Sequence, residues 1–105
     1  MSAKVLWSPQ ARKDLLNIYA VISRDNQAAA ERYFARFQDK AARLSQHPRL
    51  GQRRADIAAS VRQLVEPPFL MLYEVFPDHG DEAVTEIVIV RIVDGRRRPS
   101  GFLAL

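Results

Sequence analysis

The sequence predicts an α+β fold in which two helices pack on one face of a sheet that contains a three-stranded antiparallel meander. In the first half of the chain, apolar residues recur at three- and four-residue steps, which is typical of amphipathic helices. The second half is rich in β-branched and aromatic residues, which is typical of strands. Short segments with Pro, Gly and Asp separate these strands, so consecutive strands are antiparallel. The 105 residues suit a single domain that spans residues 1–105.

The first half predicts one strand followed by a helix hairpin. Residues 3–7 are an apolar stretch that we expect to form the strand. Ser8-Pro9 follows at once, and a serine cap with a proline at the first helical position signals the start of a helix. This helix ends near Arg24-Asp25, and Asn26 caps a second helix that runs to about Gln46. Because the link is so short, the two helices form an antiparallel hairpin.

The second half predicts a three-stranded meander after a basic connector. His47-Pro48 ends the second helix, and residues 48–60 form the connector, in which residues 56–59 can make one short helical turn. The three predicted strands are residues 61–65, 69–76 and 84–93. The predicted order is therefore strand, helix, helix and a three-stranded antiparallel meander, with the helices on one face.

Neither face of the last two predicted strands is clearly polar. One face of the 69–76 strand carries Phe69, Met71, Tyr73 and Val75, and the other carries Leu70, Leu72 and Phe76. In the 84–93 strand, Val88, Val90 and Ile92 alternate with Ile87, Ile89 and Val93. A helix hairpin covers one face only, so we expect the other to meet the C-terminal tail (Phe102, Leu103 and Leu105), a second subunit or a partner peptide.

The composition excludes several classes of protein and site. With no cysteine, the chain has no disulfide, thiol nucleophile or cysteine metal site. No apolar run reaches the roughly 18 residues of a membrane span, and the N-terminus lacks the pattern of a signal peptide, so we expect a cytoplasmic protein with no membrane contact. His47 and His79 have no metal-ligand spacing, and no Gly-rich phosphate loop occurs. We therefore expect no metal and no cofactor.

The charge pattern favours an acidic or nucleic-acid partner. The net charge is +4, and thirteen of the sixteen basic residues are arginine, a bias that a GC-rich genome also explains. The arginines near the predicted sheet are Arg53, Arg54, Arg62, Arg91, Arg96, Arg97 and Arg98. Together they could hold a phosphate, or each could be a surface cation at a strand end. Metal-free RNA cleavage would also need a proton carrier, for which Tyr73 and His79 are the nearest candidates.

A series of short motifs along nearly the whole chain resembles the ParE branch of the ParE/RelE toxin superfamily of bacterial toxin–antitoxin systems. In order, the motifs are Trp7-Ser8-Pro9-Gln10-Ala11, Asp14-Leu15, Ile18-Tyr19, Asn26, Ala29-Ala30, Phe34, Pro48-Arg49-Leu50-Gly51, Val61-Arg62, Leu72-Tyr73, Ile89-Val90-Arg91 and Gly95-Arg96-Arg97. The sequence departs from the pattern at Asp94, where these toxins often carry histidine.

The resemblance implies a plasmid-stabilisation type of toxin that a cognate ParD-like antitoxin neutralises in a hetero-oligomer. For the ParE branch it implies binding to DNA gyrase without catalysis, with indirect contact to DNA. For the RelE branch it implies a ribosome-dependent endoribonuclease, here with Arg62, Arg91 and Arg97 around the phosphate. That branch uses a tyrosine or histidine near the end of the fold, and residues 99–105 contain neither, which favours ParE.

We accordingly expect no catalytic residues and a contact surface for the partners. The residues that we predict to make this surface are Arg62, Tyr73, Arg91, Arg96, Arg97, Arg98 and Phe102. The alternatives are the ribonuclease and an inactive protein that keeps the toxin fold.

Overall fold

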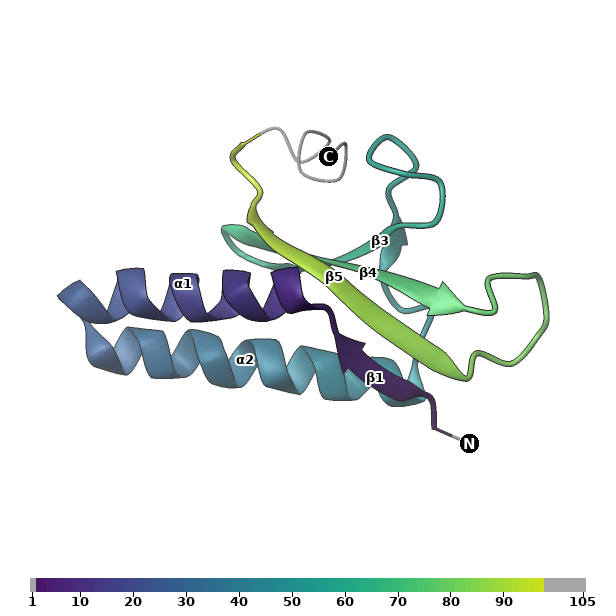
Figure 1. The fold of residues 1–105 in the computed structure, drawn as a ribbon, viewed down its shortest axis with the longest axis horizontal. Coiled ribbons are helices and arrows are strands. Elements are labelled where there is room, and N and C mark those ends of the chain that lie inside the picture. The colour runs from purple at the N-terminus through teal and green to yellow at the C-terminus, as the bar shows by residue number, and fades with distance from the viewer. Residues whose placement is uncertain (1, 98–105) are drawn as a thin grey trace.

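The computed structural model of the chain describes residues 2–97, in which two helices pack against one five-stranded sheet (Figure 1). The elements are β1 (Lys4–Trp7), α1 (Pro9–Asp25), α2 (Gln27–Gln46), β2 (Gln52–Arg53), β3 (Arg62–Glu66), β4 (Phe69–Phe76) and β5 (Glu86–Asp94). The strand order is β1-β5-β4-β3-β2. β1 runs parallel to β5, and the other neighbours are antiparallel. The predicted α+β fold is therefore confirmed.

Two capping residues explain where both helices begin and where α1 ends. The Ser8 side chain accepts a hydrogen bond from the Ala11 N–H at 3.0 Å, and Pro9 occupies the first turn of α1. Asn26 serves both helices: its N–H donates to the Ile22 carbonyl at 2.9 Å, and its side chain accepts from the Ala29 N–H at 2.9 Å. Because one residue ends α1 and starts α2, the hairpin is as tight as the sequence predicts.

The helix hairpin covers one face of the sheet and buries the larger core (Figure 1). The buried members of this core are Ala3, Ala11, Leu15, Phe37, Ala41, Leu44, Met71, Tyr73, Val75, Ile87, Ile89 and Ile92. The Phe37 ring of α2 packs edge-on against Phe69 of β4, with ring centroids 5.8 Å apart. Burial of a large apolar side chain contributes about 1.5–3 kcal/mol, so these contacts supply the main attraction between the two layers.

The opposite face of the sheet is covered in part by residues 54–61, of which residues 54–60 were predicted only as a connector and Val61 as the start of a strand. A second, smaller core consists of Val61, Leu70, Leu72 and Val93, against which Ile57, Ala58 and Val90 pack. In the same segment, β2 pairs with β3 through Gln52 and Arg53, and hydrogen-bonded turns follow in place of a helical turn at residues 56–59. The expected C-terminal cover, residues 102–105, lies outside the described residues.

β5 contains one irregularity that changes which residues face the helices. Tyr73 pairs with Ile89 but Leu72 pairs with Arg91, so Val90 is an extra residue on β5, as in a β-bulge. The alternation shifts by one residue at this point. Ile92 therefore joins Ile87 and Ile89 in the main core, whereas the sequence analysis groups Val93 with them. β5 also begins at Glu86 and not at Val84.

Candidate partner-binding surface

Arg91 is bound to the first helix in the described structure. Its Nε donates to Asp14 Oδ2 at 2.7 Å and its Nη2 donates to Asp14 Oδ1 at 3.1 Å. Asp14 Oδ2 also accepts the Ile92 N–H at 3.0 Å. The side chains of Arg91 and Asp14 are only 17% and 14% exposed, and the hydrogen bonds that Arg91 donates to Asp14 raise the pKa of Arg91.

The position of Asp14 follows from the length of β1. Because β1 ends at Trp7, β5 has no neighbouring strand along this edge beyond Ile89. The start of α1 supplies the missing partners: the Ser8 N–H donates to the Ile89 carbonyl at 2.9 Å, and Ser8 Oγ donates to the Val90 carbonyl at 3.0 Å. Asp14, six residues after Ser8, continues this series by accepting the Ile92 N–H. Arg91 and Asp14 thus hold α1 against the open edge of β5.

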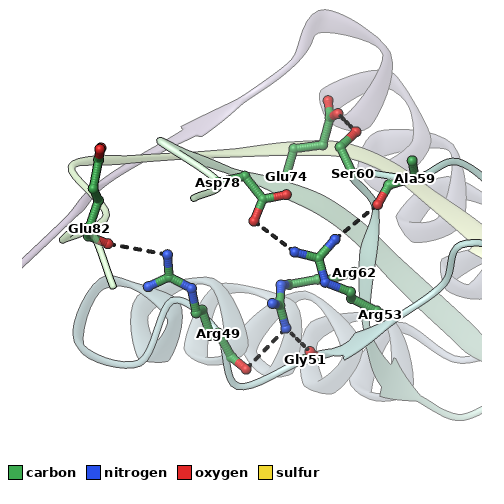
Figure 2. A network of polar contacts seen from close by, with 9 residues as sticks. All are labelled: Arg49, Gly51, Arg53, Ala59, Ser60, Arg62, Glu74, Asp78 and Glu82. Carbon is green, nitrogen blue, oxygen red and sulfur yellow. Dashed lines mark hydrogen bonds and ion pairs between the residues drawn. The ribbon is translucent and has the colours of Figure 1, made fainter. Parts of the chain in front are cut away.

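Arg62 and Tyr73 hold the segment between α2 and β2. Arg62 Nη1 donates to the Gly51 carbonyl at 2.9 Å and to the Arg49 carbonyl at 3.4 Å (Figure 2). The Gly51 N–H donates to Tyr73 Oη at 2.7 Å. Tyr73 is fully buried, and this burial raises the pKa of its phenol. A side chain with no exposed surface touches no partner directly, so we leave Tyr73 out of the proposed contact surface.

The described structure does not bring the arginines of the ribonuclease alternative to one point. Arg62 lies opposite Tyr73 on β3, and Arg91 lies opposite Leu72 on β5, so β4 separates the two backbones by about 10 Å. Each is bound to a different segment of the chain. His79 lies exposed in the turn region after β4. Arg62, Arg91 and Arg97 therefore do not converge on one proton carrier in the described part of the chain.

Arg96 and Arg97 lie exposed just after β5. The Asp94 carboxylate accepts from the Arg96 backbone N–H at 2.9 Å and from its Nε and Nη2 at 3.0 and 2.6 Å. These hydrogen bonds lower the pKa of Asp94 to about 2. The Arg96 side chain is 75% exposed, so the turn is shaped by its aspartate while its charges stay at the surface.

The two exposed arginines border an apolar groove beside α1. The groove measures about 460 Å³ and is lined by Asn17, Ile18, Val21, Ile22, Phe69, Asp94, Arg96 and Arg97. The α1 residues of this groove are not indicated by the sequence, because Ile18 and Ile22 recur at the three- and four-residue spacing of the apolar stripe that is expected to face the core. Val21 could have indicated the groove, because it is an apolar residue outside that stripe. In the structure this residue is 57% exposed. The predicted contacts Arg98 and Phe102 lie outside the described residues.

The described residues contain no group of three or more His, Asp or Glu side chains that could hold a metal ion. Among residues 2–97, neither helix is both long and apolar enough to cross a membrane.

Comparison with known proteins identifies the family. The family described as ParE toxin of the type II toxin–antitoxin system parDE matches residues 5–99. The chain belongs to the ParE toxin family. No curated protein matches it.

Two solved structures support the fold. The chain is similar to a structure titled as the chromosomal ParDE toxin–antitoxin system of P. aeruginosa, with 25% identity over 89% of this chain and 96% of that one and a TM-score of 0.68. It also shares its fold with a chain of the toxin–antitoxin complex RelBE2 of Mycobacterium tuberculosis, with 23% identity, 90% and 99% coverage and a TM-score of 0.63. The chain is thus a type II toxin with the ParE/RelE fold.

Proposed function

We propose that this ParE-family toxin arrests growth by binding DNA gyrase, that it does so in the cytoplasm, and that a ParD-like antitoxin neutralises it. The observation that carries the proposal is the exposed pair Arg96 and Arg97 at the rim of the apolar groove. A protein interface commonly combines an apolar centre with a charged rim, and arginine is enriched in such interfaces. Arg98 and Phe102 extend this predicted surface beyond the described residues.

The placement of the other arginines favours binding over RNA cleavage. Arg91 is engaged by Asp14, Arg62 by backbone carbonyls, and Tyr73 is buried. A metal-free ribonuclease needs cations and a proton carrier together at one phosphate. A gyrase-binding toxin needs only an exposed surface, which the groove and its rim provide. Arg91 then supports that surface by holding α1 to β5, and Arg62 holds the segment before β2.

The antitoxin is proposed to be a disordered or amphipathic segment that folds on the toxin. The groove offers it an apolar lining, and the free edge of β1 offers it backbone hydrogen bonds. The resulting hetero-oligomer would cover the surface that contacts gyrase. Bound to gyrase, the toxin would also lie close to the DNA that gyrase holds.

The test is a trapping assay with purified toxin, gyrase and supercoiled plasmid. After denaturation and proteolysis, we expect linear DNA from trapped cleaved complexes, and excess antitoxin should remove this band. Toxin that is folded and arrests growth but gives no linear DNA would contradict the proposal. New RNA ends in primer extension soon after induction would then favour the ribonuclease.

A further inference from the structure

Three arginines from separate segments gather beside the loop that joins β4 and β5 (Figure 2). Arg49 follows α2, Arg53 lies on β2 and Arg62 begins β3. Arg49 and Arg53 are exposed and Arg62 is half-buried. We call this group the β2-end cluster. It lies apart from the turn that carries Arg96 and Arg97, which follows the other end of the sheet.

Backbone carbonyls fix most of the contacts in the β2-end cluster. Arg49 Nη2 donates to the Glu82 carbonyl at 3.2 Å, and Arg53 Nη1 donates to the Ala59 carbonyl at 3.0 Å. Arg62 donates to two carbonyls, as described above. A carbonyl holds a guanidinium in place without neutralising it. The side chains are therefore ordered before any ligand binds, which lowers the entropic cost of binding an anion.

One carboxylate opposes the cluster directly. Asp78 Oδ1 accepts from Arg53 Nη2 at 3.0 Å. Glu82 contributes its backbone carbonyl to Arg49, and the Glu74 carboxylate accepts from Ser60 Oγ and points away from the arginines in Figure 2. Three guanidinium charges and one ion-paired carboxylate leave the cluster positive. Its exposed guanidinium N–H groups match the oxygens of a phosphodiester.

We propose that the β2-end cluster binds the phosphate backbone of duplex DNA. The choice of duplex DNA rests on the proposed function, because gyrase holds such a duplex. The proposal thus deepens that function. The net charge of +4 acts in the same direction. Contacts of this kind depend on phosphates and not on bases, so the binding is salt-sensitive and independent of sequence. Asp78 competes with the phosphate for Arg53.

The experiment measures binding of the full-length purified toxin to a labelled duplex of about 20 base pairs by fluorescence anisotropy, without gyrase or antitoxin. Arg53→Ala and Arg49→Ala should each weaken binding about three- to tenfold and reduce the salt slope by about one. Asp78→Asn should tighten binding about two- to fivefold, because it frees Arg53. The matched control is Arg36→Ala, which removes an equal charge from α2, where Arg36 pairs with Glu66 at 3.3 Å.

Several outcomes would overturn the proposal. If Arg53→Ala binds DNA like Arg36→Ala, the cluster serves only to hold its loops together. The same conclusion follows if Asp78→Asn lowers the thermal midpoint and leaves DNA affinity unchanged. Asp78→Asn keeps all three arginines, so it remains informative if Arg53→Ala fails to fold. Tighter binding to single-stranded RNA of equal length would overturn the choice of duplex DNA. Because the DNA-binding assay contains no gyrase, its failure would not contradict gyrase binding, which the trapping assay tests separately.

Discussion

Two Arg–Asp pairs of this toxin, Arg91 with Asp14 and Arg96 with Asp94, differ in what they connect. Arg91 and Asp14 are 77 positions apart in the sequence, both largely buried, and they join β5 to α1. Arg96 and Asp94 are two positions apart, and the Arg96 side chain is 75% exposed. Both are Arg–Asp pairs with short contacts. The difference shows that an ion pair by itself does not reveal a structural role, whereas burial and sequence separation do.

The largest expected effect is at Gly51, which Arg62 and Tyr73 hold. An added Cβ would lie 2.5 Å from the Gln63 carbonyl oxygen and 2.6 Å from Tyr73 Oη, so the backbone would have to move. We expect Gly51→Ala to lower the free energy of unfolding by about 3 kcal/mol in a denaturant titration.

Gly80→Ala is the control for this substitution. A Cβ at Gly80 meets no atom within 4 Å, and only its φ of +30° opposes alanine, for a cost of about 1–2 kcal/mol. Equal losses at the two glycines would mean that the contacts of Gly51 are not essential to the fold.

The second effect is at the buried pair. Asp14→Ala removes three hydrogen bonds, two from Arg91 and one from the Ile92 N–H. The expected loss is about 2–3 kcal/mol, because these bonds are charged and largely shielded from water. Asp94→Ala, measured in parallel, should change stability much less. A similar loss of stability in Asp14→Ala and Asp94→Ala would contradict the distinction between the two Arg–Asp pairs.

The third effect concerns the Tyr73 hydroxyl. Tyr73→Phe leaves the buried Gly51 N–H without its acceptor, and we expect a loss of about 1–2 kcal/mol. Burial raises the pKa of Tyr73, so the folded chain holds the phenolic proton more tightly than the unfolded chain. The stability that this tighter proton binding contributes is complete below the ordinary pKa of 10.0, and it is lost as the pH rises through the raised pKa. Above pH 10, the free energy of unfolding should therefore fall less steeply with rising pH for Tyr73→Phe than for the parent chain.

The smallest effect is at Asp94, whose pKa Arg96 lowers to about 2. Because the pKa is lower in the folded chain, the ionised carboxylate stabilises the fold at a pH above the ordinary pKa of 3.8. This stabilisation is lost as the pH falls from about 4 to about 2. The pair is exposed, so salt screens it and the change in stability is slight. A carboxyl NMR titration should show the pKa of Asp94 returning toward 3.8 in Arg96→Ala. An unchanged pKa would mean that Arg96 does not hold the carboxylate.

The helices and three main strands were predictable because each carries a local signal. Ser8-Pro9 and Asn26 mark the helix starts, and proline or glycine marks the ends of the strands. β2 was not predictable in this way, since its two residues pair only because β3 folds back beside them. The bulge at Val90 also has no local signal, because it depends on the register with β4.

The candidate surface was predictable in composition but not in arrangement. Arg62, Arg91, Arg96 and Arg97 all belong to the basic group of seven arginines that the sequence singles out. Only the fold shows that Asp14, far away in the sequence, engages Arg91 and that the carbonyls of residues 49 and 51 engage Arg62. Long-range pairing of this kind leaves no periodic pattern in a single sequence.

We propose that Arg96 and Arg97 act on the target, whereas Arg91 acts through the fold. The most direct measurement compares Arg96→Ala combined with Arg97→Ala against the parent toxin in the gyrase trapping assay, with the thermal midpoint of each protein measured alongside. We expect the double variant to keep its midpoint and to lose the linear DNA band. A double variant that remains folded and still yields linear DNA at the parent level would contradict the claim.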